Sequence, residues 1–248
     1  MSLKSIIHSY FAGLYQDTMS RTYQEAQERI AKCLPPEGYC LDCGSGSGHQ
    51  LQALQSKTDL HLKNYVGIEW NEHRVSLAKK KGLQVHRADL NQNLPFADET
   101  FHCVFGLSVL EHLINGCKFM QEAYRVLKPN GHLILITPNL STWFNIFLLG
   151  IGKMPSSGPH PDSTTLLRWN TPIQFRDTGV SKSEETTPMD RHLVVFTYRT
   201  LLYYLKTLGF RKVEGMAYGL YPFPRFLQPL LEKLDPWHCH QMLFDCKR

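Results

Sequence analysis

A short glycine-rich stretch, Tyr39–Gly48, carries the clearest chemical signal in the chain. Its first three residues are apolar and predict a strand, and Gly44, Gly46 and Gly48 then alternate with serines before a run compatible with a helix. Because glycine has no side chain, such a turn lets the backbone approach a ligand closely. The start of the helix leaves N–H groups for a polar or anionic partner. This order of elements is typical of a nucleotide-binding unit.

The spacing of the glycines separates two kinds of nucleotide-binding loop. The dinucleotide fingerprint is G-x-G-x-x-G, but here the third glycine comes one position early and His49 takes its place. Asp42 stands two residues before the first glycine, which gives D-x-G-x-G-x-G. This pattern resembles motif I of the class I S-adenosylmethionine-dependent methyltransferases. The alternative is a glycine turn that only joins a strand to a helix.

Two acidic residues follow at the ends of the next expected strands. Glu69 ends the apolar run 65–69, 21 residues after Gly48, where a carboxylate can accept hydrogen bonds from both hydroxyls of a ribose. Trp70 could pack on an adenine or cover the edge of the sheet. The resemblance places Asp89, followed by Leu90, near the adenine amino group, which its carboxylate could bind. Either acid could instead be an ordinary surface or turn residue.

Later phrases resemble the same family, in its methyltransferase domain 11/23 form. They are LPFADETFHCVF at 94–105, SVLEHL at 108–113, RVLKPNG at 125–131 and, more loosely, HLVVFT at 192–197. The resemblance covers residues 38–140 closely and 190–210 loosely. It implies S-adenosylmethionine as the cofactor, bound by Asp42, Gly44, Ser45, Gly46, Gly48, Glu69, Trp70, Asp89, Leu90 and Ser108.

The family resemblance leaves the catalytic residues less defined. His112, beside Glu111, is the first candidate for a general base, because a similar Glu-His pair lies by the substrate in the ubiquinone O-methyltransferase branch. His112 could equally stabilise a helix start or contact the methionine part of the cofactor. That branch has a further acid upstream, where this chain has Ser108 or Val109, so we predict no metal. His192 and Asn139 are second candidates.

Composition limits the class of protein. The chain has 248 residues, 42% of them hydrophobic and 20% charged, which suits a folded domain rather than a disordered chain. Its net charge of +5 comes from scattered basic residues, so we predict no nucleic-acid partner. No apolar stretch reaches the roughly 18 residues of a membrane span. No secretory signal is evident, and a cytoplasmic location is the default expectation.

The cysteines predict reduced thiols rather than a disulfide framework. There are seven of them, widely spread along the chain. Cys40 and Cys43 match C-x-x-C, but Cys40 lies inside an expected strand, where residues three apart point to opposite faces. We therefore interpret the pair as core residues.

Apolar patterning and breakers divide the chain into four parts. Residues 1–36 predict a helical cover, and 37–140 the cofactor-binding half of the domain. Residues 141–195 predict a lid or substrate insertion, because 154–190 is rich in Pro, Ser, Thr and Gly; a loose insertion is the alternative. Residues 196–248 predict a helix and antiparallel strands that complete the same sheet.

We therefore expect an α/β fold, with a doubly wound, mostly parallel seven-stranded sheet of the Rossmann-like methyltransferase type. The resemblance implies that the last strand lies antiparallel between the fifth and the sixth. The expected function is methyl transfer to a small molecule, apolar or aromatic in part. An NAD(P)-dependent oxidoreductase is the alternative enzyme, disfavoured by the early third glycine and by the missing Tyr-x-x-x-Lys pair. A catalytically inactive binding protein is a further alternative, and no feature indicates an oligomeric state.

Overall fold

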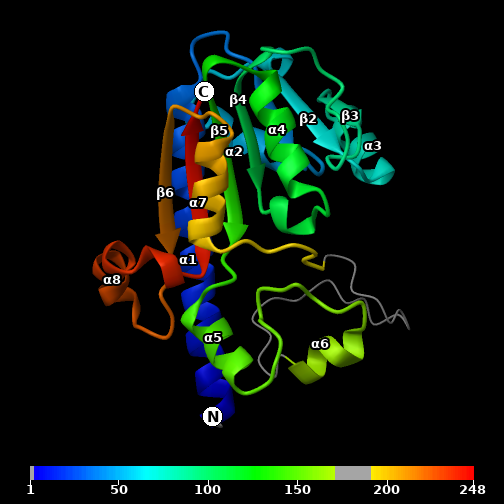
Figure 1. Cartoon of the computed structure of the whole chain (residues 1–248). Coiled ribbons are helices and arrows are strands. Elements are labelled where there is room, and N and C mark those ends of the chain that lie inside the picture. The colour runs from blue at the N-terminus through cyan, green and yellow to red at the C-terminus, as the bar shows by residue number, and fades with distance from the viewer. Residues whose placement is uncertain (1–2, 171–190) are drawn as a thin grey trace.

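A computed structural model describes residues 3–170 and 191–248 (Figure 1). The first half contains α1 (Leu3–Cys33), β1 (Cys40–Cys43), α2 (His49–Gln55), η1 (Leu62–Asn64), β2 (Tyr65–Glu69), α3 (Glu72–Lys80), β3 (Gln84–Arg87), β4 (Phe101–Leu107), η2 (Leu110–His112) and α4 (Gly116–Val126). The second half contains β5 (Leu127–Pro138), α5 (Trp143–Gly150), α6 (Thr164–Asn170), α7 (Tyr198–Thr207), β6 (Lys212–Tyr218), η3 (Arg225–Leu227), α8 (Gln228–Leu234), η4 (Pro236–His238) and β7 (Gln241–Lys247).

The described strands form one seven-stranded sheet in the order β3-β2-β1-β4-β5-β7-β6. Neighbouring strands from β3 to β5 pair in parallel, whereas β7 pairs antiparallel with both β5 and β6. The chain order reverses between β1 and β4, which is the switch point where ligands bind in open α/β sheets. The predicted fold is confirmed, including the antiparallel last strand between the fifth and sixth.

Helices cover both faces of the sheet, so its central strands are buried on both sides. One apolar core packs α4 and α7 against the sheet, through residues such as Phe119 and Leu201. The other packs α1, α2 and α3 against the opposite face, through residues such as Ile30 and Leu54. Cys43 lies in the first core and Cys40 in the second, as their spacing in a strand predicts.

Helix α1 is tied to the sheet by ion pairs along its C-terminal half. Arg29 Nη1 lies 2.8 Å from Glu214 of β6 and 3.0 Å from Asp245 of β7. Arg21 binds Glu232 of α8, which is itself buried, at 2.7 Å. The N-terminal half of α1 extends past the ends of the strands, toward α5 in Figure 1.

Two segments show local structure that the sequence patterns did not reveal. Residues 112–127 do not form one continuous helix, because a 3-10 turn, η2, comes first and α4 begins only at Gly116. The stretch 154–190, predicted as part of a lid or as a loose insertion, contains the helix α6. A short apolar run such as TTLL carries too weak a pattern to reveal a seven-residue helix. Residues 171–190 of that predicted lid lie outside the described residues.

Candidate active site

The candidate site lies at the C-terminal edge of the parallel strands. In Figure 1 the arrows of β2, β4 and β5 lead toward one end of the molecule, where α5 and α6 also lie, and β1 runs parallel to β2 and β4. Each strand is followed directly by a sequence-predicted residue: Gly44 after β1, Trp70 after β2, Ser108 after β4 and Asn139 after β5. The topology therefore brings together residues that are far apart in the chain.

Backbone geometry explains the glycines of the loop after β1. Gly44, Gly46 and Gly48 have φ angles of 78°, 55° and 85°, a region that favours glycine. A Cβ on Gly48 would lie 2.1 Å from Leu83 Cδ1, whereas a Cβ on Gly46 would meet only His49 Cδ2, at 3.7 Å. The loop is thus packed tightly beneath Gly48 and open above Gly46.

Asp42 lies beneath this loop rather than on its surface. The residue is 2% exposed, and its carboxylate accepts a hydrogen bond from the Tyr65 hydroxyl. Burial, partly offset by this hydrogen bond, raises the pKa of Asp42 to about 7. Burial also raises the pKa of Tyr65. Asp42 therefore joins β1 to β2 from inside the sheet.

Glu69 connects the glycine loop to the end of β2. Its Oε2 accepts a hydrogen bond from Gly46 N at 3.0 Å, and its Oε1 accepts one from Asn71 N at 2.7 Å. The residue is only 6% exposed. An ionised carboxylate offers about four lone-pair sites, so each oxygen retains capacity to accept another hydrogen bond.

The remaining predicted residues on this side differ in their surroundings. Trp70 is 69% exposed and therefore does not cover the sheet edge. Asp89 uses Oδ1 to accept hydrogen bonds from Asn91 N and Nδ2, at 2.9 and 2.8 Å. Leu90 is buried in the core. Both hydrogen bonds to Asp89 end on Oδ1, so Oδ2 can still accept a hydrogen bond from a ligand.

Ser108 begins the second part of the site with a strained backbone. Its φ of 57° is unusual for a residue other than glycine, and such strain is often found at functional sites. Its Oγ accepts a hydrogen bond from Tyr23 of α1 at 3.1 Å. The N-terminal helix thus reaches the end of β4, so α1 takes part in forming the site as well as covering the sheet.

Beyond Ser108, the structure brings together Glu111, His112 and His192. One ligand atom of each lies within 4.8 Å of the others. Glu111 is buried and accepts a hydrogen bond from Thr137 Oγ1 at 3.1 Å. The backbone joins the two segments, since Leu193 N donates to Glu111 O at 2.7 Å. Two imidazoles and one carboxylate could hold a divalent cation or could move a proton.

Backbone carbonyls fix the orientation of both histidine rings. Nδ1 of His112 lies 3.1 Å from Arg191 O, and Nδ1 of His192 lies 2.6 Å from Ser157 O. A carbonyl can only accept, so each Nδ1 carries the proton in the neutral ring and Nε2 is the basic atom. The two rings meet edge to face, with centroids 5.1 Å apart.

His160 supports this pair and was not predicted from the sequence. Its ring stacks on His192 with centroids 4.7 Å apart, its Nδ1 accepts from His192 N, and its Nε2 faces Ser156 O. Burial lowers the pKa of His160. A lone histidine in a Gly-Pro-His turn carries no sequence signal, because its partner is 32 residues away in the chain.

The side chain of Asn139 is held by backbone groups of neighbouring segments. The residue is fully buried, and its amide nitrogen donates to Trp237 O and Cys239 O at 2.7 and 2.9 Å. Its amide oxygen accepts from Ser141 N and Tyr198 N at 3.1 and 3.2 Å. These bonds use both ends of the amide to join β5, α7 and the segment before β7. We therefore leave Asn139 out of the chemistry proposed below, although the sequence made it a candidate.

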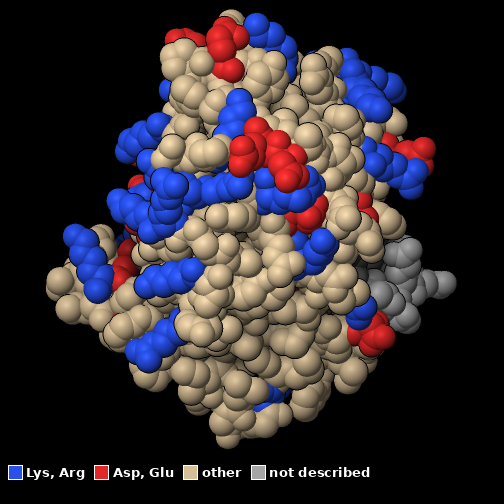
Figure 2. Space-filling model, turned by 45° about the horizontal axis from the view of Figure 1, so that its top comes forward, with Lys and Arg blue, Asp and Glu red and all other residues tan. Residues whose placement is uncertain are grey.

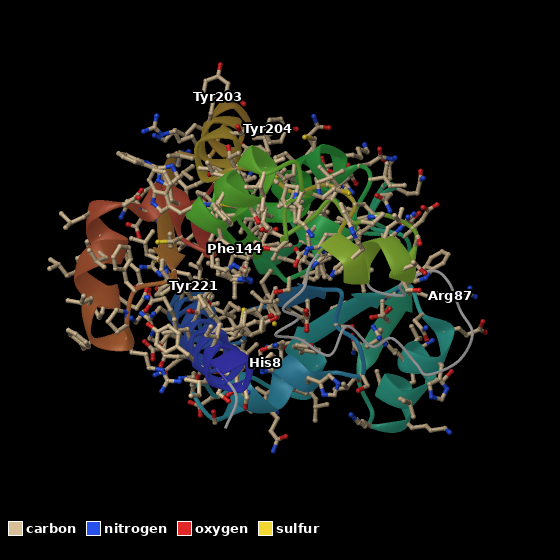
Figure 3. The ribbon with its side chains drawn as sticks, turned by 90° about the horizontal axis from the view of Figure 1, so that it is seen from below. His8, Arg87, Phe144, Tyr203, Tyr204 and Tyr221 are labelled. Carbon is tan, nitrogen blue, oxygen red and sulfur yellow. The ribbon has the colours of Figure 1, made fainter. Side chains whose placement is uncertain are left out.

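Aromatic residues of the C-terminal half separate into two groups. In the end view of Figure 3, Phe144 and Tyr221 lie toward the middle, with His8 of α1, whereas Tyr203 and Arg87 lie at the periphery. Tyr203 is 72% exposed, and Tyr204 donates its hydroxyl to Cys117 O on α4. Tyr203 and Tyr204 therefore belong to the outer surface of α7, not to the strand ends.

Comparisons with known proteins show partial similarity to methyltransferases. Residues 41–135 match a family of methyltransferase domains. Over 96 residues the chain is 33% identical to phthiotriol/phenolphthiotriol dimycocerosates methyltransferase of Mycobacterium tuberculosis, covering 37% of this chain and 34% of that protein. Over 126 residues it is 27% identical to a probable S-adenosylmethionine-dependent methyltransferase of Mycolicibacterium smegmatis, covering 50% and 46% of the two chains. The chain thus spans less than half of these curated relatives.

Solved structures agree on the fold over nearly the whole chain. A SAM-dependent methyltransferase from Archaeoglobus fulgidus superposes with a TM-score of 0.58 and 16% identity, covering 100% of both chains. A possible histamine N-methyltransferase from Thermotoga maritima gives a TM-score of 0.54 and 16% identity, covering 96% and 98%.

Together with the strand order, these matches show that the chain has the fold of the class I methyltransferases and that residues 41–135 match a methyltransferase domain family. Within that class, the segment from β1 to β5 is the part that matches the methyltransferase domain family. A domain of this family implies S-adenosylmethionine as its cofactor.

Proposed function

We propose that this chain transfers a methyl group from S-adenosylmethionine to a small-molecule acceptor that is apolar or aromatic in part. One observation carries the proposal. At one edge of the sheet, the glycine loop bonded to Glu69 lies beside His112 and His192, whose rings are held by backbone carbonyls. The first group suits a nucleoside cofactor, and the second suits proton transfer from an acceptor.

The residues around the glycine loop fit the cofactor. Above Gly46 the backbone is open, so a ligand can approach where a side chain would otherwise stand. We assign Glu69 to the two ribose hydroxyls, because both oxygens keep acceptor capacity after holding Gly46 and Asn71. We assign Oδ2 of Asp89 to the adenine amino group, and the exposed ring of Trp70 to the adenine face.

The histidine pair fits the acceptor side. S-adenosylmethionine supplies an electrophilic methyl group on a good, neutral leaving group, so the protein mainly has to align the acceptor with it. When the acceptor atom carries a proton, Nε2 of His112 or His192 takes that proton as the new bond to carbon forms and the carbon–sulfur bond breaks. Glu111, within 4.8 Å, then stabilises the imidazolium.

The acceptor class rests on neighbouring apolar surface and on one group of relatives. Phe144 lies toward the middle of this end of the molecule (Figure 3). The curated relatives from Mycobacterium tuberculosis are named for methylating phthiotriol dimycocerosates, which supports an apolar acceptor. Oxygen, nitrogen and carbon acceptors are all compatible with this arrangement.

Calorimetric titration of the purified protein tests the cofactor first. We expect S-adenosylmethionine and S-adenosylhomocysteine to bind with micromolar Kd values and NADH not to bind. Binding of NADH alone would support the oxidoreductase alternative. The acceptor class is then tested with S-adenosylmethionine that carries a tritiated methyl group. Organic and aqueous extracts of the same cells are each offered as a source of acceptor, and the tritium transferred into each is compared. Cofactor binding without transfer to either extract would favour an inactive binding protein.

A further inference from the structure

Three separate segments expose large apolar side chains at the end of the molecule beyond the strand ends. They are the first turns of α1, the helix α5, and η3 with α8. The exposed residues are Ile6, Ile7, Tyr10, Trp143, Ile146, Phe147, Leu149, Ile151, Phe223, Phe226, Leu230 and Leu234. We refer to these twelve residues as the apolar end face. Scattered single apolar residues are ordinary on a protein surface, whereas a gathered group marks an interaction site.

Helix α5 has the reverse of the usual pattern for a surface helix. It contains no charged residue, and its buried side chains are Asn145 and Leu148. Phe147 is 60% exposed and Ile151, just after the helix, is 55% exposed. A helix on a water-facing surface normally directs polar residues outward. Here the outward face is apolar, while the buried Asn145 is hydrogen-bonded to backbone and serine groups.

The N-terminal turns of α1 project in the same direction. Residues 5–10 are all exposed, and this part of the helix lies outside both apolar cores of the described residues. Ile6, Ile7 and Tyr10 follow helical spacing and form one stripe. The helix is nevertheless held in place, because Tyr10 donates to Pro222 O at 2.8 Å and Arg225 donates to Gly13 O at 2.7 Å.

The other two segments are joined to this end by contacts of their own. Trp143 of α5 donates to Asp235 at 2.9 Å and stacks on His238 with ring centroids 4.1 Å apart. Asp235 directly follows α8. The three segments are therefore parts of one packed end of the domain, and both Figure 1 and Figure 3 place them at that end.

Charge is distributed unevenly around this face. The sequence has no Asp or Glu in residues 1–16, 123–161 and 215–231, which include the first turns of α1, all of α5 and all of η3. The basic residues at this end are Lys153 after α5, Arg225 at the start of η3 and Lys233 in α8. The acids beside Lys233 already have partners, since Glu232 pairs with Arg21 and Asp235 accepts a hydrogen bond from Trp143. Figure 2, in which the opposite end of the molecule is turned toward the viewer, shows charged side chains gathered over that opposite end.

We infer that the apolar end face docks onto the surface of a lipid bilayer that carries anionic headgroups. Apolar and aromatic side chains bordered by Lys and Arg are what an interfacial segment presents to headgroups and upper acyl chains. Trp and Tyr prefer that interface because they combine an apolar ring with a polar atom. The docking that we infer is peripheral, and no described helix is long and apolar enough to cross a bilayer. A projecting helix end suits insertion among lipids, whereas a second copy would need a matching hollow.

Docking in this way explains how an apolar acceptor would reach the site. The face borders the same end of the molecule as the histidine pair, so an acceptor could leave the bilayer without crossing water. This last step rests on the proposed function. Docking itself does not, and it can be measured without cofactor or acceptor.

Flotation with vesicles of equal parts phosphatidylglycerol and phosphatidylcholine tests the inference on the full chain. We expect the wild type to float with these vesicles, and to float less with pure phosphatidylcholine. The double variant Phe147→Glu, Phe226→Glu should lower the bound fraction at least tenfold. Both positions are strongly exposed, so the variant should fold, and an unchanged circular dichroism melt checks this. Tyr203→Glu is the matched control, an equally exposed aromatic on α7, and should bind as the wild type does.

Three outcomes would overturn the inference. The wild type could fail to float with either vesicle. Tyr203→Glu could lose as much binding as the double variant, which would show a general charge effect. Light scattering could instead show a dimer that Phe147→Glu dissociates, which would make the face an interface between copies. Vesicle binding combined with absent methyl transfer would leave the inference intact and count against the proposed function alone.

Discussion

The glycine-loop side and the histidine side of the site are built in opposite ways. From Gly44 to Asp89 the cofactor side uses one continuous stretch of chain, in which each residue follows a strand or turn next in sequence. The histidine side is built from segments that are far apart in the chain. His112 bonds to Arg191, 79 residues later, and His192 bonds to Ser157. The glycine-loop side depends on neighbouring residues of one stretch, so few of them can change without disturbing it. The histidine side can be altered by changing a loop that is distant in the chain. This difference suits a domain that keeps its cofactor and changes its acceptor.

The largest expected effect is on turnover when the histidine side is broken. His112→Ala or His192→Ala should lower the rate of methyl transfer by roughly 10²–10³-fold, because a positioned general base contributes about that much. The double variant should lose little more than either single variant, since the rings act as one unit. Single-turnover kinetics measure the rates, and His61→Ala, at an exposed surface position, is the control.

Cofactor affinity should not follow that loss. Titration calorimetry of S-adenosylhomocysteine should give Kd values for both histidine variants within about twofold of the wild type, as expected for groups that act on the acceptor. A parallel loss of cofactor affinity would instead place the histidines against the methionine part of the cofactor.

Breaking the cofactor side should give the next largest effect. Glu69→Gln removes the charge that holds Gly46 N and Asn71 N and should weaken S-adenosylhomocysteine binding by about 2 kcal/mol, or roughly 30-fold. Calorimetry measures the loss. Glu72→Gln, whose side chain is 75% exposed near the same edge, should bind as the wild type does. A loss near zero at position 69 would remove the ribose assignment.

Asp89 should contribute less than Glu69, because it meets one neutral amino group. Asp89→Ala should weaken cofactor binding by about 1 kcal/mol, or roughly fivefold, without unfolding the domain. Asp98→Ala, an exposed aspartate on the following loop, provides the comparison. Unchanged affinity in the Asp89 variant would exclude the adenine role.

A smaller effect concerns stability and pH, and it tests the glycine-loop side of the site, because Asp42 is buried beneath that loop. Its pKa is raised to about 7, from about 3.9 in an unfolded chain. Between these values the folded protein holds a proton that the unfolded chain has released, so stability falls as pH rises. Asp42→Asn should flatten that fall.

Thermal melts between pH 4.5 and 7.5 measure the Asp42 effect. A difference on the order of 1 kcal/mol shifts the Tm by roughly 2–4 °C in a chain of this size. Glu28→Gln, a partly exposed glutamate of α1, should keep the wild-type pH dependence. An Asp42→Asn melt that tracks the wild type throughout would show that the carboxyl is ionised in the fold.

The smallest expected effect is that of chelation. Glu111, His112 and His192 could hold a cation, but our proposal uses the histidines as bases, so dialysis against EDTA should leave turnover within about twofold. A large loss that Zn²⁺ or Mn²⁺ restores would mean that the group is a metal site, and that the missing upstream acid is replaced by His192.

Sequence patterns predicted the parallel half of the fold and the residues of the glycine loop, because those features repeat locally. Strand β4 appears as an apolar run, and Gly44, Gly46 and Gly48 stand together in the sequence. Residues that depend on tertiary pairing could not be found in this way. His160 has meaning only beside His192, and Asn139 was a candidate until its amide proved to be occupied by backbone partners. The apolar face of α5 was visible as composition, whereas its direction required the fold.

The position of β7 between β5 and β6 also sets the order in which the chain can fold during synthesis. In the folded sheet strand β6 pairs with β7 rather than with β5, and β7 follows β6 in the chain, so the ribosome makes it later. Arg29 of α1 likewise lacks Asp245 until β7 has emerged. The parallel strands β1 to β5 can therefore assemble first, and α1 and β6 remain incompletely covered until the final strand slides between its neighbours. Nascent chains halted before Gln241 should for this reason be the species that chaperones bind.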